Sequence, residues 1–300
     1  MSAKNASAPA KSYVTFYLCV YNLVEFVGWL RILVGVILYM LHGSSARRMV
    51  YDSVAEFVHK YTPVVIASPT VSFAQHHPIV ATLLQRMSEV HGYIGPLVVI
   101  FQSLALLEVV HAALGWVKAN PLVVAVQVAS RVLVLYCVSE RYQASATSPY
   151  YALMVFAWAL SEVSRYPYYI NQLLDSPSFW ALWMRYSMFV VLYPLGVLGE
   201  MQLIWASLPH DLAWPWVDAN GWSVRDLLFL AVLPVYIPGL FFLYSRLLAS
   251  RRKVLGNDFI GSKGRAAVNQ HRDAYLSRFR KLHDKNVVAA EDAEINQSWK

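Results

Sequence analysis

The sequence predicts an all-α polytopic membrane protein, a bundle of six transmembrane helices with a short N-terminal segment and a basic cytoplasmic C-terminal tail. Of its 300 residues, 57% are hydrophobic and only 14% are charged, whereas a soluble domain carries about 25% charged residues. Several stretches approach or exceed the roughly 20 apolar residues that cross a bilayer core. Much of the net charge of +7 follows the last apolar run, and basic residues collect on the cytoplasmic side of membrane proteins.

The first three expected spans cover about residues 13–41, 93–117 and 122–138. The segment before them, Met1–Ala10, is small and polar and lacks the apolar core of a secretory signal peptide. We therefore expect the first span to remain in the mature protein. Between the first two spans, residues 49–58 have apolar side chains at helical spacing, which is typical of a helix lying along the membrane interface.

The last three expected spans cover about residues 150–170, 183–203 and 224–248. Asp175-Ser176-Pro177 breaks the helix after the fourth span. The loop 209–222, between the fifth and sixth spans, carries acidic residues but no Lys or Arg. That composition is typical of a translocated loop.

Six spans place both chain ends on one side, which the basic tail identifies as cytoplasmic. The predicted organisation is an N-terminal cytoplasmic segment (1–12), a transmembrane catalytic domain (13–248) and a basic tail (249–300). The tail is charged and only weakly amphipathic, so we expect it to be mostly flexible, with a short helix near residues 274–283. Its basic residues flank a span, which favours contact with anionic lipid over nucleic acid.

Six ionisable residues lie in or near the expected spans: Glu25, Glu108, Arg131, Glu162, Arg165 and Glu200. An Arg, Lys or Asp at a helix centre costs about 2.5–3.5 kcal/mol on translocon scales, so many isolated charges would prevent insertion. We therefore expect these groups to pair inside the bundle. No His, Asp and Glu set has the spacing of a metal site, and Cys19 and Cys137, in separate apolar runs, are expected to be small buried residues.

The segment Tyr193-Pro194-Leu195-Gly196-Val197-Leu198-Gly199-Glu200 combines several unusual features. Seven residues are about two helical turns, so Tyr193 and Glu200 fall on nearly the same face, roughly 10 Å apart along the axis. Pro194 interrupts the backbone hydrogen bonds, while Gly196 and Gly199 allow a neighbouring helix or a substrate to approach closely. Since an ionisable residue inside a membrane is a functional-site hypothesis, we predict that Tyr193 and Glu200 are catalytic. The alternative is that Tyr193 fills a packing gap and Glu200 lies at the luminal interface.

This segment, preceded by Arg185-Tyr186, resembles the signature of the very-long-chain (3R)-3-hydroxyacyl-CoA dehydratases, also called protein tyrosine phosphatase-like proteins. Further matches follow in chain order: residues 17–29, Phe101 to Glu108, His111 to Gly115, Gln127 to Arg131, and Arg165 to Tyr169. The resemblance extends over about residues 13–248. It implies an endoplasmic reticulum membrane enzyme that dehydrates (3R)-3-hydroxyacyl-CoA to trans-2-enoyl-CoA, the third step of fatty acid elongation. The implied partners are the condensing enzyme, the 3-ketoacyl-CoA reductase and the enoyl-CoA reductase.

The family's catalytic tyrosine and glutamate fall on Tyr193 and Glu200. The expected substrate-binding residues are Arg131, Arg185, Tyr186 and Gly196. The reaction removes a proton from C2 and delivers one to the departing C3 hydroxyl, and it requires no redox cofactor or metal. We expect Glu200 to perform the main proton transfer and Tyr193 to assist at the substrate oxygen or α-carbon, with the reverse assignment left open. Arg131, Arg185 and the basic loop and tail residues are candidates for binding the CoA phosphates, since a guanidinium matches phosphate geometry.

Two other function classes are alternatives. The phosphatase-like name suggests phosphate chemistry, but Ala112 follows His111 and Pro121 stands where a phosphate-binding arginine would be sought. No thiolate nucleophile is present there, which leaves a catalytically inert, pseudophosphatase-like membrane scaffold or binding protein. A transporter or channel would also contain buried Arg/Glu pairs, but many transporters consist of repeated halves, and no internal repeat is visible here.

Overall fold

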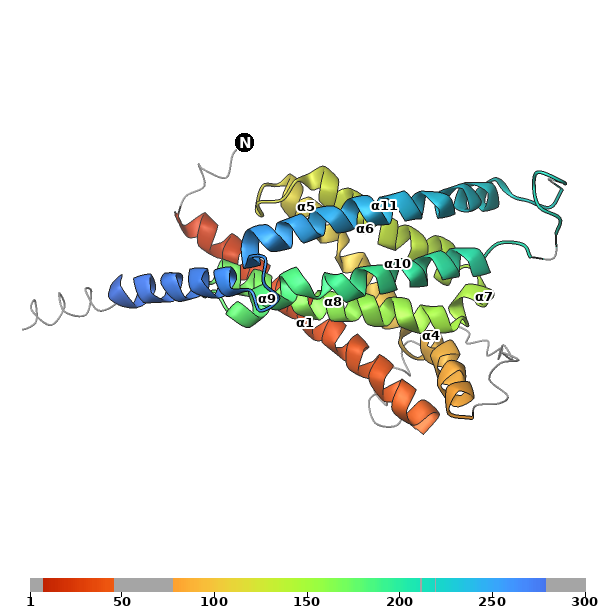
Figure 1. Cartoon of the computed structure of the whole chain (residues 1–300), viewed down its shortest axis with the longest axis horizontal. Coiled ribbons are helices and arrows are strands. Elements are labelled where there is room, and N and C mark those ends of the chain that lie inside the picture. Colours follow the sequence, from red (N-terminus) through yellow and green to blue (C-terminus); the bar gives the residue numbers. More distant parts are fainter. Residues whose placement is uncertain (1–7, 46–77, 211, 219, 279–300) are drawn as a thin grey trace, which may run out of the picture.

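The computed structural model describes residues 8–45, 78–210, 212–218 and 220–278 (Figure 1), and within these ranges it is helical and contains no strand. The elements in chain order are α1 (Ala8–His42), η2 (Gly43–Ser45), α4 (Pro78–Leu104), α5 (Leu106–Ala113), α6 (Pro121–Val134), η4 (Leu135–Ser139), α7 (Gln143–Ala146), α8 (Pro149–Leu173), α9 (Phe179–Ser187), α10 (Phe189–Ala206) and α11 (Val224–Leu255). A further helical segment, the tail helix, covers residues 262–278. The predicted all-α class is confirmed.

Local sequence signals set where three of the long helices begin. The side chain of Asn120 accepts a hydrogen bond from the backbone N–H of Leu122 at the start of α6, and Ser148 does the same for Tyr150 at the start of α8. Each of these caps is followed by a proline at the first helical position, where the missing N–H costs nothing. Ser223 and Asp226 form a reciprocal capping box at the start of α11. These helices therefore begin within one residue of the predicted spans.

Helix α8 is the centre of the bundle. It packs against α1, α4, α9 and α10, and Figure 1 shows it between α1 and α10. Its buried residues point in several directions around the helix: Tyr151, Ala152, Met154, Val155, Ala157, Trp158, Ala159, Glu162, Ser164 and Tyr166. A helix that is buried on more than one side needs neighbours on each side, and the other long helices supply them.

Among the described residues, five helical stretches are long and apolar enough to cross a membrane: Ser12–Ser45, Pro78–Ala113, Pro121–Ser139, Phe189–Ala206 and Val224–Leu255. The predicted fourth span, which corresponds to α8, is not one of them. Helix α8 has 25 residues and is long enough, but it carries buried polar residues that include Glu162 and Ser164. Helix α8 thus differs from the five apolar stretches because it carries buried polar residues and is surrounded by other helices.

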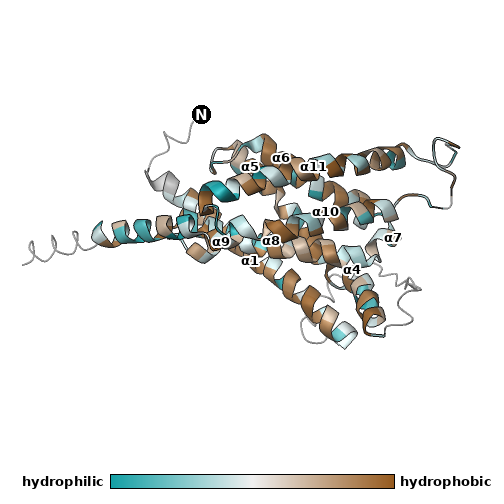
Figure 2. Ribbon diagram, viewed as in Figure 1, coloured by the Kyte–Doolittle hydropathy of each residue, from teal (hydrophilic) through white to brown (hydrophobic). Residues whose placement is uncertain are grey.

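The outer helices expose large apolar side chains, as expected for surfaces that face lipid. On α11 these include Leu228, Val235, Phe241 and Phe242. In Figure 2, α1 and most of α11 are coloured as hydrophobic, whereas the tail helix is mainly hydrophilic. A soluble protein rarely exposes contiguous apolar patches of this kind. Cys19 is partly buried and Cys137 is exposed, both as free thiols, so the prediction of burial is wrong for Cys137.

Two predicted spans differ from the observed helices. The second begins at Pro78 rather than near residue 93, and Arg86 in this additional part binds the end of α1. Arg86 donates to the carbonyl oxygens of Met40 at 2.8 Å and Leu41 at 2.5 Å, and such carbonyls lack partners within their own helix. The fifth is divided, with α9 ending at Ser187 and α10 beginning at Phe189. The predicted interfacial helix at 49–58 lies outside the described residues.

The first part of the tail is helical, which differs from the expected mostly flexible segment. Helix α11 continues to Leu255 and ends at Gly256, whose φ of 99° favours glycine. The side chain of Arg251 donates to the carbonyl oxygen of Phe259 at 2.9 Å, and Trp183 of α9 donates to the same oxygen at 3.1 Å. The backbone N–H of Ser262 donates to Asp258 and holds the pKa of that exposed carboxyl below its ordinary value. Residues 279–300 lie outside the described part.

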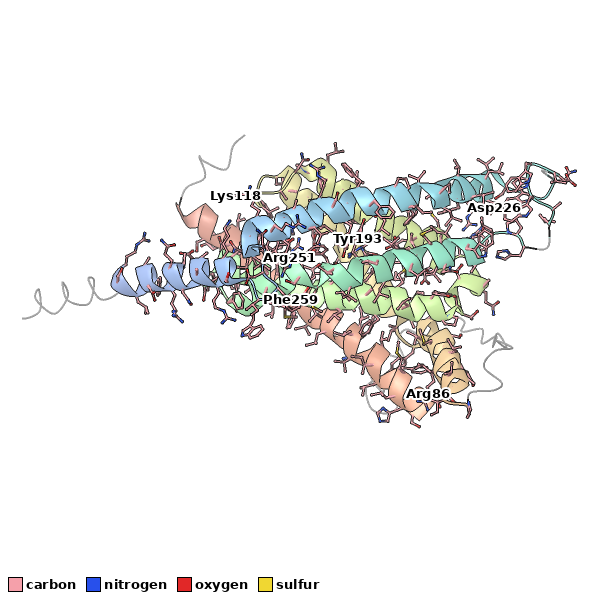
Figure 3. The ribbon with its side chains drawn as sticks, viewed as in Figure 1. Arg86, Lys118, Tyr193, Asp226, Arg251 and Phe259 are labelled. Atoms are coloured by element: carbon pink, nitrogen blue, oxygen red, sulfur yellow. The ribbon has the colours of Figure 1, made fainter. Side chains whose placement is uncertain are left out.

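The described start of α1 and the end of α11 lie at the same end of the bundle (Figure 1). We call this the tail end, and it carries Arg251 and Phe259 (Figure 3). Asp226 lies at the opposite end, and Tyr193 lies between the two. This arrangement agrees with the prediction that both ends of the transmembrane domain face the same side.

Gly199 allows α8 and α10 to approach closely, so substituting it tests this packing. A Cβ atom at Gly199 would lie 2.8 Å from the Cβ atom and 3.0 Å from the backbone nitrogen of Met154. We expect Gly199→Ala to destabilise the fold by about 1–3 kcal/mol, the usual cost of overpacking. Thermal unfolding of the purified protein in detergent measures the change.

Gly239→Ala is the matched control, because a Cβ atom at this glycine of α11 meets nothing within 4 Å. Alanine is favoured over glycine in a helix by up to about 1 kcal/mol. The midpoint of thermal unfolding should therefore stay the same or rise. Equal midpoints for the two variants would contradict the close contact between α8 and α10.

Candidate active site

Glu200 of α10 is held by side chains from two other helices. Its Oε1 atom accepts a hydrogen bond of 3.0 Å from Nε1 of Trp158 on α8. Its Oε2 atom accepts one of 3.1 Å from the hydroxyl of Tyr236 on α11. Each carboxyl oxygen therefore has one fixed donor, and the carboxyl group lies where α8, α10 and α11 meet.

Tyr193 lies two turns before Glu200 on the same helix, as the seven-residue spacing predicts. Its side chain is partly buried. It is close enough to interact electrostatically with Glu200 and also with Tyr236. Among the described residues, no hydrogen bond joins Tyr193 to Glu200, so the hydroxyl that directly contacts this carboxyl group is that of Tyr236.

Gly196 lies between these two residues on α10 and is buried against α8. A Cβ atom at this position would lie 3.8 Å from Ala157 and 3.9 Å from Trp158, which is ordinary van der Waals contact. The glycine therefore lines the side of α10 that carries the Glu200 and Trp158 contact. Gly196 therefore lies beside the Glu200 and Trp158 contact, whereas the close approach of α10 to α8 is made by Gly199.

Arg131 of α6 also belongs to this cluster. Its guanidinium lies over the ring of Trp158, 5.3 Å from the ring centroid, and it interacts electrostatically with Glu200. It also forms an ion pair with Glu162. Because that pair lies inside the bundle, the guanidinium is committed to a protein carboxylate here.

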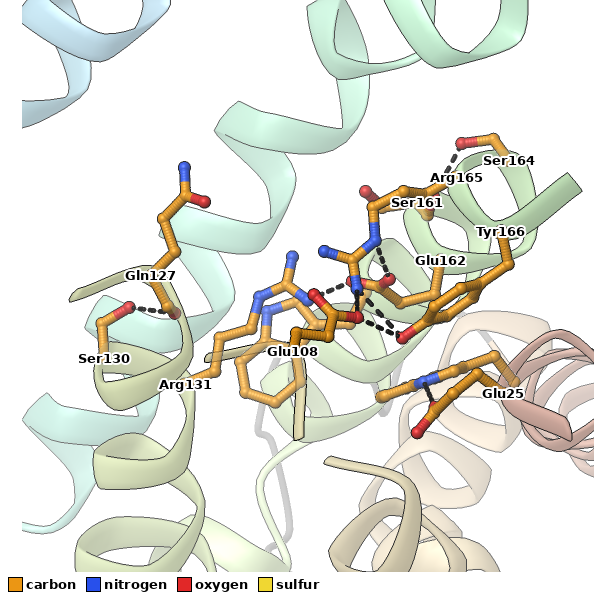
Figure 4. Close-up of polar contacts among 12 residues, drawn as sticks. Glu25, Glu108, Gln127, Ser130, Arg131, Ser161, Glu162, Ser164, Arg165 and Tyr166 are labelled. Atoms are coloured by element: carbon orange, nitrogen blue, oxygen red, sulfur yellow. Dashed lines mark hydrogen bonds and ion pairs between the residues drawn. The ribbon is translucent and has the colours of Figure 1, made fainter. Parts of the chain in front are cut away.

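Glu162 connects Arg131 to a second arginine. Nε of Arg165 lies 2.7 Å from Oε2 of Glu162, and Nη2 of Arg165 lies 2.6 Å from Oε1 of Glu108. The hydroxyl of Tyr166 donates to the same Glu108 oxygen at 2.9 Å. Figure 4 shows these side chains converging from α5, α6 and α8. The predicted pairing of charges inside the bundle is confirmed for Arg131, Glu162, Arg165 and Glu108.

Glu25 of α1 differs from the other buried carboxyl groups. It is fully buried, and its Oε2 atom accepts a hydrogen bond of 3.1 Å from Trp29. Its Oε1 atom has no hydrogen-bond partner within the described part of the chain. The interpretation of Glu25 as one half of an ion pair is therefore wrong.

Arg185 and Tyr186 lie on α9, apart from the Glu200 cluster. The Arg185 guanidinium is 5.8 Å from the Tyr186 ring, and Tyr186 packs edge-on against Tyr168 with ring centroids 5.9 Å apart. Within the described ranges, neither side chain forms a hydrogen bond or ion pair with Tyr193 or Glu200. Arg185 interacts electrostatically with Glu162, which relates it to the buried network rather than to the Glu200 carboxyl group.

Sequence reasoning missed Trp158 and Tyr236. Trp158 lies in an apolar run that has no motif, and its hydrogen bond depends on the close packing of α8 and α10. Tyr236 lies between Pro234 and Pro238, and this pair of prolines inside a span was the only local signal. Both residues are recognisable only once three helices are placed together.

The arrangement can accept, hold and donate protons. One carboxyl group, two phenol groups and an indole N–H lie together, beside a guanidinium that is already paired. Among the residues that the structure describes, no group of three or more His, Cys, Asp and Glu side chains is placed to hold a metal ion. The side chains present are those of general acid–base chemistry.

Comparisons with known proteins show which family this chain resembles. The family described as "Protein tyrosine phosphatase-like protein, PTPLA" matches residues 102–257, a range that contains every residue of the Glu200 cluster. "Very-long-chain (3R)-3-hydroxyacyl-CoA dehydratase hpo-8" of Caenorhabditis elegans is 31% identical over 258 residues, which cover 83% of this chain and 98% of the relative. "Very-long-chain (3R)-3-hydroxyacyl-CoA dehydratase 2" of Homo sapiens is 30% identical over 251 residues, covering 81% and 82%.

A mouse relative matches a shorter part of the chain. "Very-long-chain (3R)-3-hydroxyacyl-CoA dehydratase 1" of Mus musculus is 35% identical over 175 residues, which cover 54% of this chain. The chain spans 60% of the length of that relative. No solved structure matches the chain.

Removing the charge of Glu162 tests the importance of the buried ion-pair network. Glu162→Gln leaves Arg131 and Arg165 without the carboxylate that joins them. Breaking a buried pair by removing one partner costs about 3–5 kcal/mol, so we expect a large fall in the unfolding midpoint in detergent.

Glu140→Gln is the control for this variant. Glu140 pairs with His91 at 2.9 Å, but both side chains are about a quarter exposed, and such pairs contribute about 0–1 kcal/mol. A Glu162→Gln protein as stable as the Glu140→Gln protein would show that the network does not hold the bundle together.

Proposed function

The chain belongs to the protein tyrosine phosphatase-like family, and from this premise we propose that it is a very-long-chain (3R)-3-hydroxyacyl-CoA dehydratase. It would remove water from a long-chain (3R)-3-hydroxyacyl-CoA to give the trans-2-enoyl-CoA, the third step of the elongation cycle. The observation that carries the proposal is the placement of Glu200 and Tyr193 two turns apart on nearly the same face of α10, in a chain whose relatives bear this name.

Glu200 acts as the general base in the proposed reaction. Its carboxylate takes the proton from C2, beside the thioester, and the electron pair of that C–H bond forms the C2=C3 double bond. The C3–O bond breaks, and Tyr193 donates its hydroxyl proton to the departing oxygen, which leaves as water. A proton then passes from Glu200 to the Tyr193 phenolate, relayed by the released water because the two side chains lie two helical turns apart on α10, and both groups are restored.

The buried position of the site supports a membrane-embedded substrate. The aliphatic chain of the acyl-CoA would lie among apolar helices, where it is already removed from water. Arg185 and Tyr186 lie on α9, the short helix next to Arg251 at the tail end, where Nε of Arg251 donates to Ser187 at 3.3 Å. Arg185 and Arg251 are the basic residues that we propose for the CoA phosphates, with Tyr186 beside Arg185. Arg131, which is paired with Glu162 inside the bundle, has instead the role of orienting Trp158 and Glu200.

We further propose that α8 also crosses the membrane, which gives six spans in all. In this arrangement the tail end lies on the cytoplasmic side of the endoplasmic reticulum membrane. The polar residues of α8 are covered by α1, α4, α9 and α10, so they do not meet lipid. Basic residues collect at the tail end, as the cytoplasmic side requires. The proposed partners are the other enzymes of the elongation cycle.

The direct test of the reaction is the incubation of the purified, detergent-solubilised protein with a long-chain (3R)-3-hydroxyacyl-CoA. We expect enoyl-CoA to form, as measured by mass spectrometry. Tyr193→Phe and Glu200→Gln should each lower the rate by about 10²–10⁴-fold, the usual contribution of an acid–base residue. Both variants should insert into the membrane and unfold at temperatures near that of the unsubstituted protein.

Tyr150→Phe and Glu140→Gln are the matched controls, because both residues lie away from the cluster at exposed positions, and we expect them to keep full activity. Undiminished turnover in either site variant would remove the proposed mechanism. Binding of a phosphopeptide by a protein that forms no enoyl-CoA would favour the inert scaffold instead.

N-glycosylation tests the topology, because only luminal Asn-x-Ser/Thr acceptors are modified. The sequence contains two such acceptors near its ends, Asn5-Ala6-Ser7 and Asn296-Gln297-Ser298. In microsomes we expect both to stay unmodified, and an acceptor cassette inserted between Val217 and Asp218 to be glycosylated, as judged by gel mobility before and after deglycosylation. Glycosylation of either natural acceptor would contradict the proposal of six spans with cytoplasmic ends. An unglycosylated cassette would contradict it as well.

A further inference from the structure

We propose that Tyr236 of α11 is a positioning residue that fixes the carboxyl group of Glu200 for proton transfer. This inference rests on the proposed dehydratase function. Tyr236 does not belong to the predicted catalytic pair, Tyr193 and Glu200, and it lies on a different helix. Its hydroxyl donates a hydrogen bond of 3.1 Å to Oε2 of Glu200. Tyr193, by contrast, forms no hydrogen bond with Glu200 among the described residues.

The two donors on Glu200 together define the plane of its carboxyl group. Rotation about the last side-chain bond of a glutamate is nearly free, because that torsion has broad minima. Here Trp158 holds Oε1 at 3.0 Å from α8, and Tyr236 holds Oε2 at 3.1 Å from α11. Each carboxylate oxygen has two lone pairs, so one on each oxygen stays available to accept a proton from the substrate.

Tyr236 is well placed to have this effect because it lies in a stretch of α11, residues 231–238, in which most side chains are exposed. Helix α11 packs against α10 and α9, and most of its surface is exposed. Pro234 and Pro238 lie two residues before and after Tyr236, and each removes a backbone hydrogen bond from the helix. The side-chain bond to Glu200 therefore fixes this part of α11 against α10.

A second tyrosine of α11 makes the same kind of contact with α10. The hydroxyl of Tyr244 donates to the backbone carbonyl oxygen of Val190 at 3.2 Å. Tyr236 and Tyr244 are eight residues apart, about two helical turns, and both join α11 to α10. The difference is the acceptor, which is a carboxyl group for Tyr236 and a peptide carbonyl for Tyr244.

This pair of tyrosines separates a structural role from a positioning role. We expect Tyr236→Phe, which removes only the hydroxyl, to lower kcat for the dehydration about 10- to 100-fold and to leave KM within about 3-fold. That factor is the contribution of a hydrogen bond to a charged group, converted to a rate. Tyr244→Phe should keep both constants, while the two variants lower the unfolding midpoint by similar small amounts.

Infrared spectroscopy detects the hydrogen bond between Tyr236 and Glu200 without a measurement of catalytic activity. The carboxyl stretching band of Glu200 is identified as the band that disappears in Glu200→Gln. We expect Tyr236→Phe to shift this band and Tyr244→Phe to leave it unchanged. The charged and titratable groups facing Glu200 are Arg131, Tyr193 and Tyr236, and the first two are the same in both variants.

The outcomes distinguish this inference from the proposed function. If the unsubstituted protein forms enoyl-CoA and Tyr236→Phe matches it in kcat, the positioning role is wrong and the dehydratase function stands. Equal losses of kcat in Tyr236→Phe and Tyr244→Phe would show that helix packing alone is responsible, which also overturns the inference. If the unsubstituted protein forms no enoyl-CoA, the proposed function fails, and an unshifted infrared band would in addition exclude the Tyr236 contact.

Discussion

The carboxylate of Glu162, which joins Arg131 to Arg165, is the interaction on which the arrangement of this bundle depends. Inside a bilayer no water is available to satisfy charged groups, so each must find partners within the protein. Glu162 lies on α8, and its two arginines come from α6 and from the next turn of α8 itself. Arg165 continues to Glu108 of α5. Helices α5 and α6 are thereby each linked to α8 by a buried ion pair.

This network also defines one side of the candidate active site. Arg131 lies over the ring of Trp158 while it is bound to Glu162, and Trp158 donates to Glu200. A structural ion pair and an acid–base group are thus connected through a single indole ring. A charged residue in a membrane span is easily assigned to substrate binding, but Arg131 shows why its partners must be known first. The same guanidinium would have to leave Glu162 in order to bind a phosphate.

The sequence predicted features that depend on one helix and the general pairing of buried charges, but it did not predict which particular side chains meet between helices. The starts of α6, α8 and α11 were predictable because Asn120, Ser148 and Ser223 cap their own helices. The placement of Tyr193 and Glu200 on nearly the same face of α10 was predictable from their seven-residue spacing. Trp158 and Tyr236 were not, since their hydrogen bonds depend on the packing of α8 and α11 against α10. Arg86 was missed for the same reason, as its acceptors are the carbonyl oxygens at the end of α1.

The two residues of the predicted pair are therefore fixed by different means. The separation of Tyr193 and Glu200 is set by α10 alone, because both side chains leave the same helix and seven residues rotate by about 700°, or 20° short of two full turns. The orientation of the Glu200 carboxyl group is set from outside α10, by α8 and α11. Among the residues that the structure describes, Tyr193 makes no comparable hydrogen bond, so its hydroxyl is not fixed by α8 or α11. The orientation of the Glu200 carboxyl group therefore depends on the packing of three helices, whereas the spacing between Glu200 and Tyr193 depends on α10 alone.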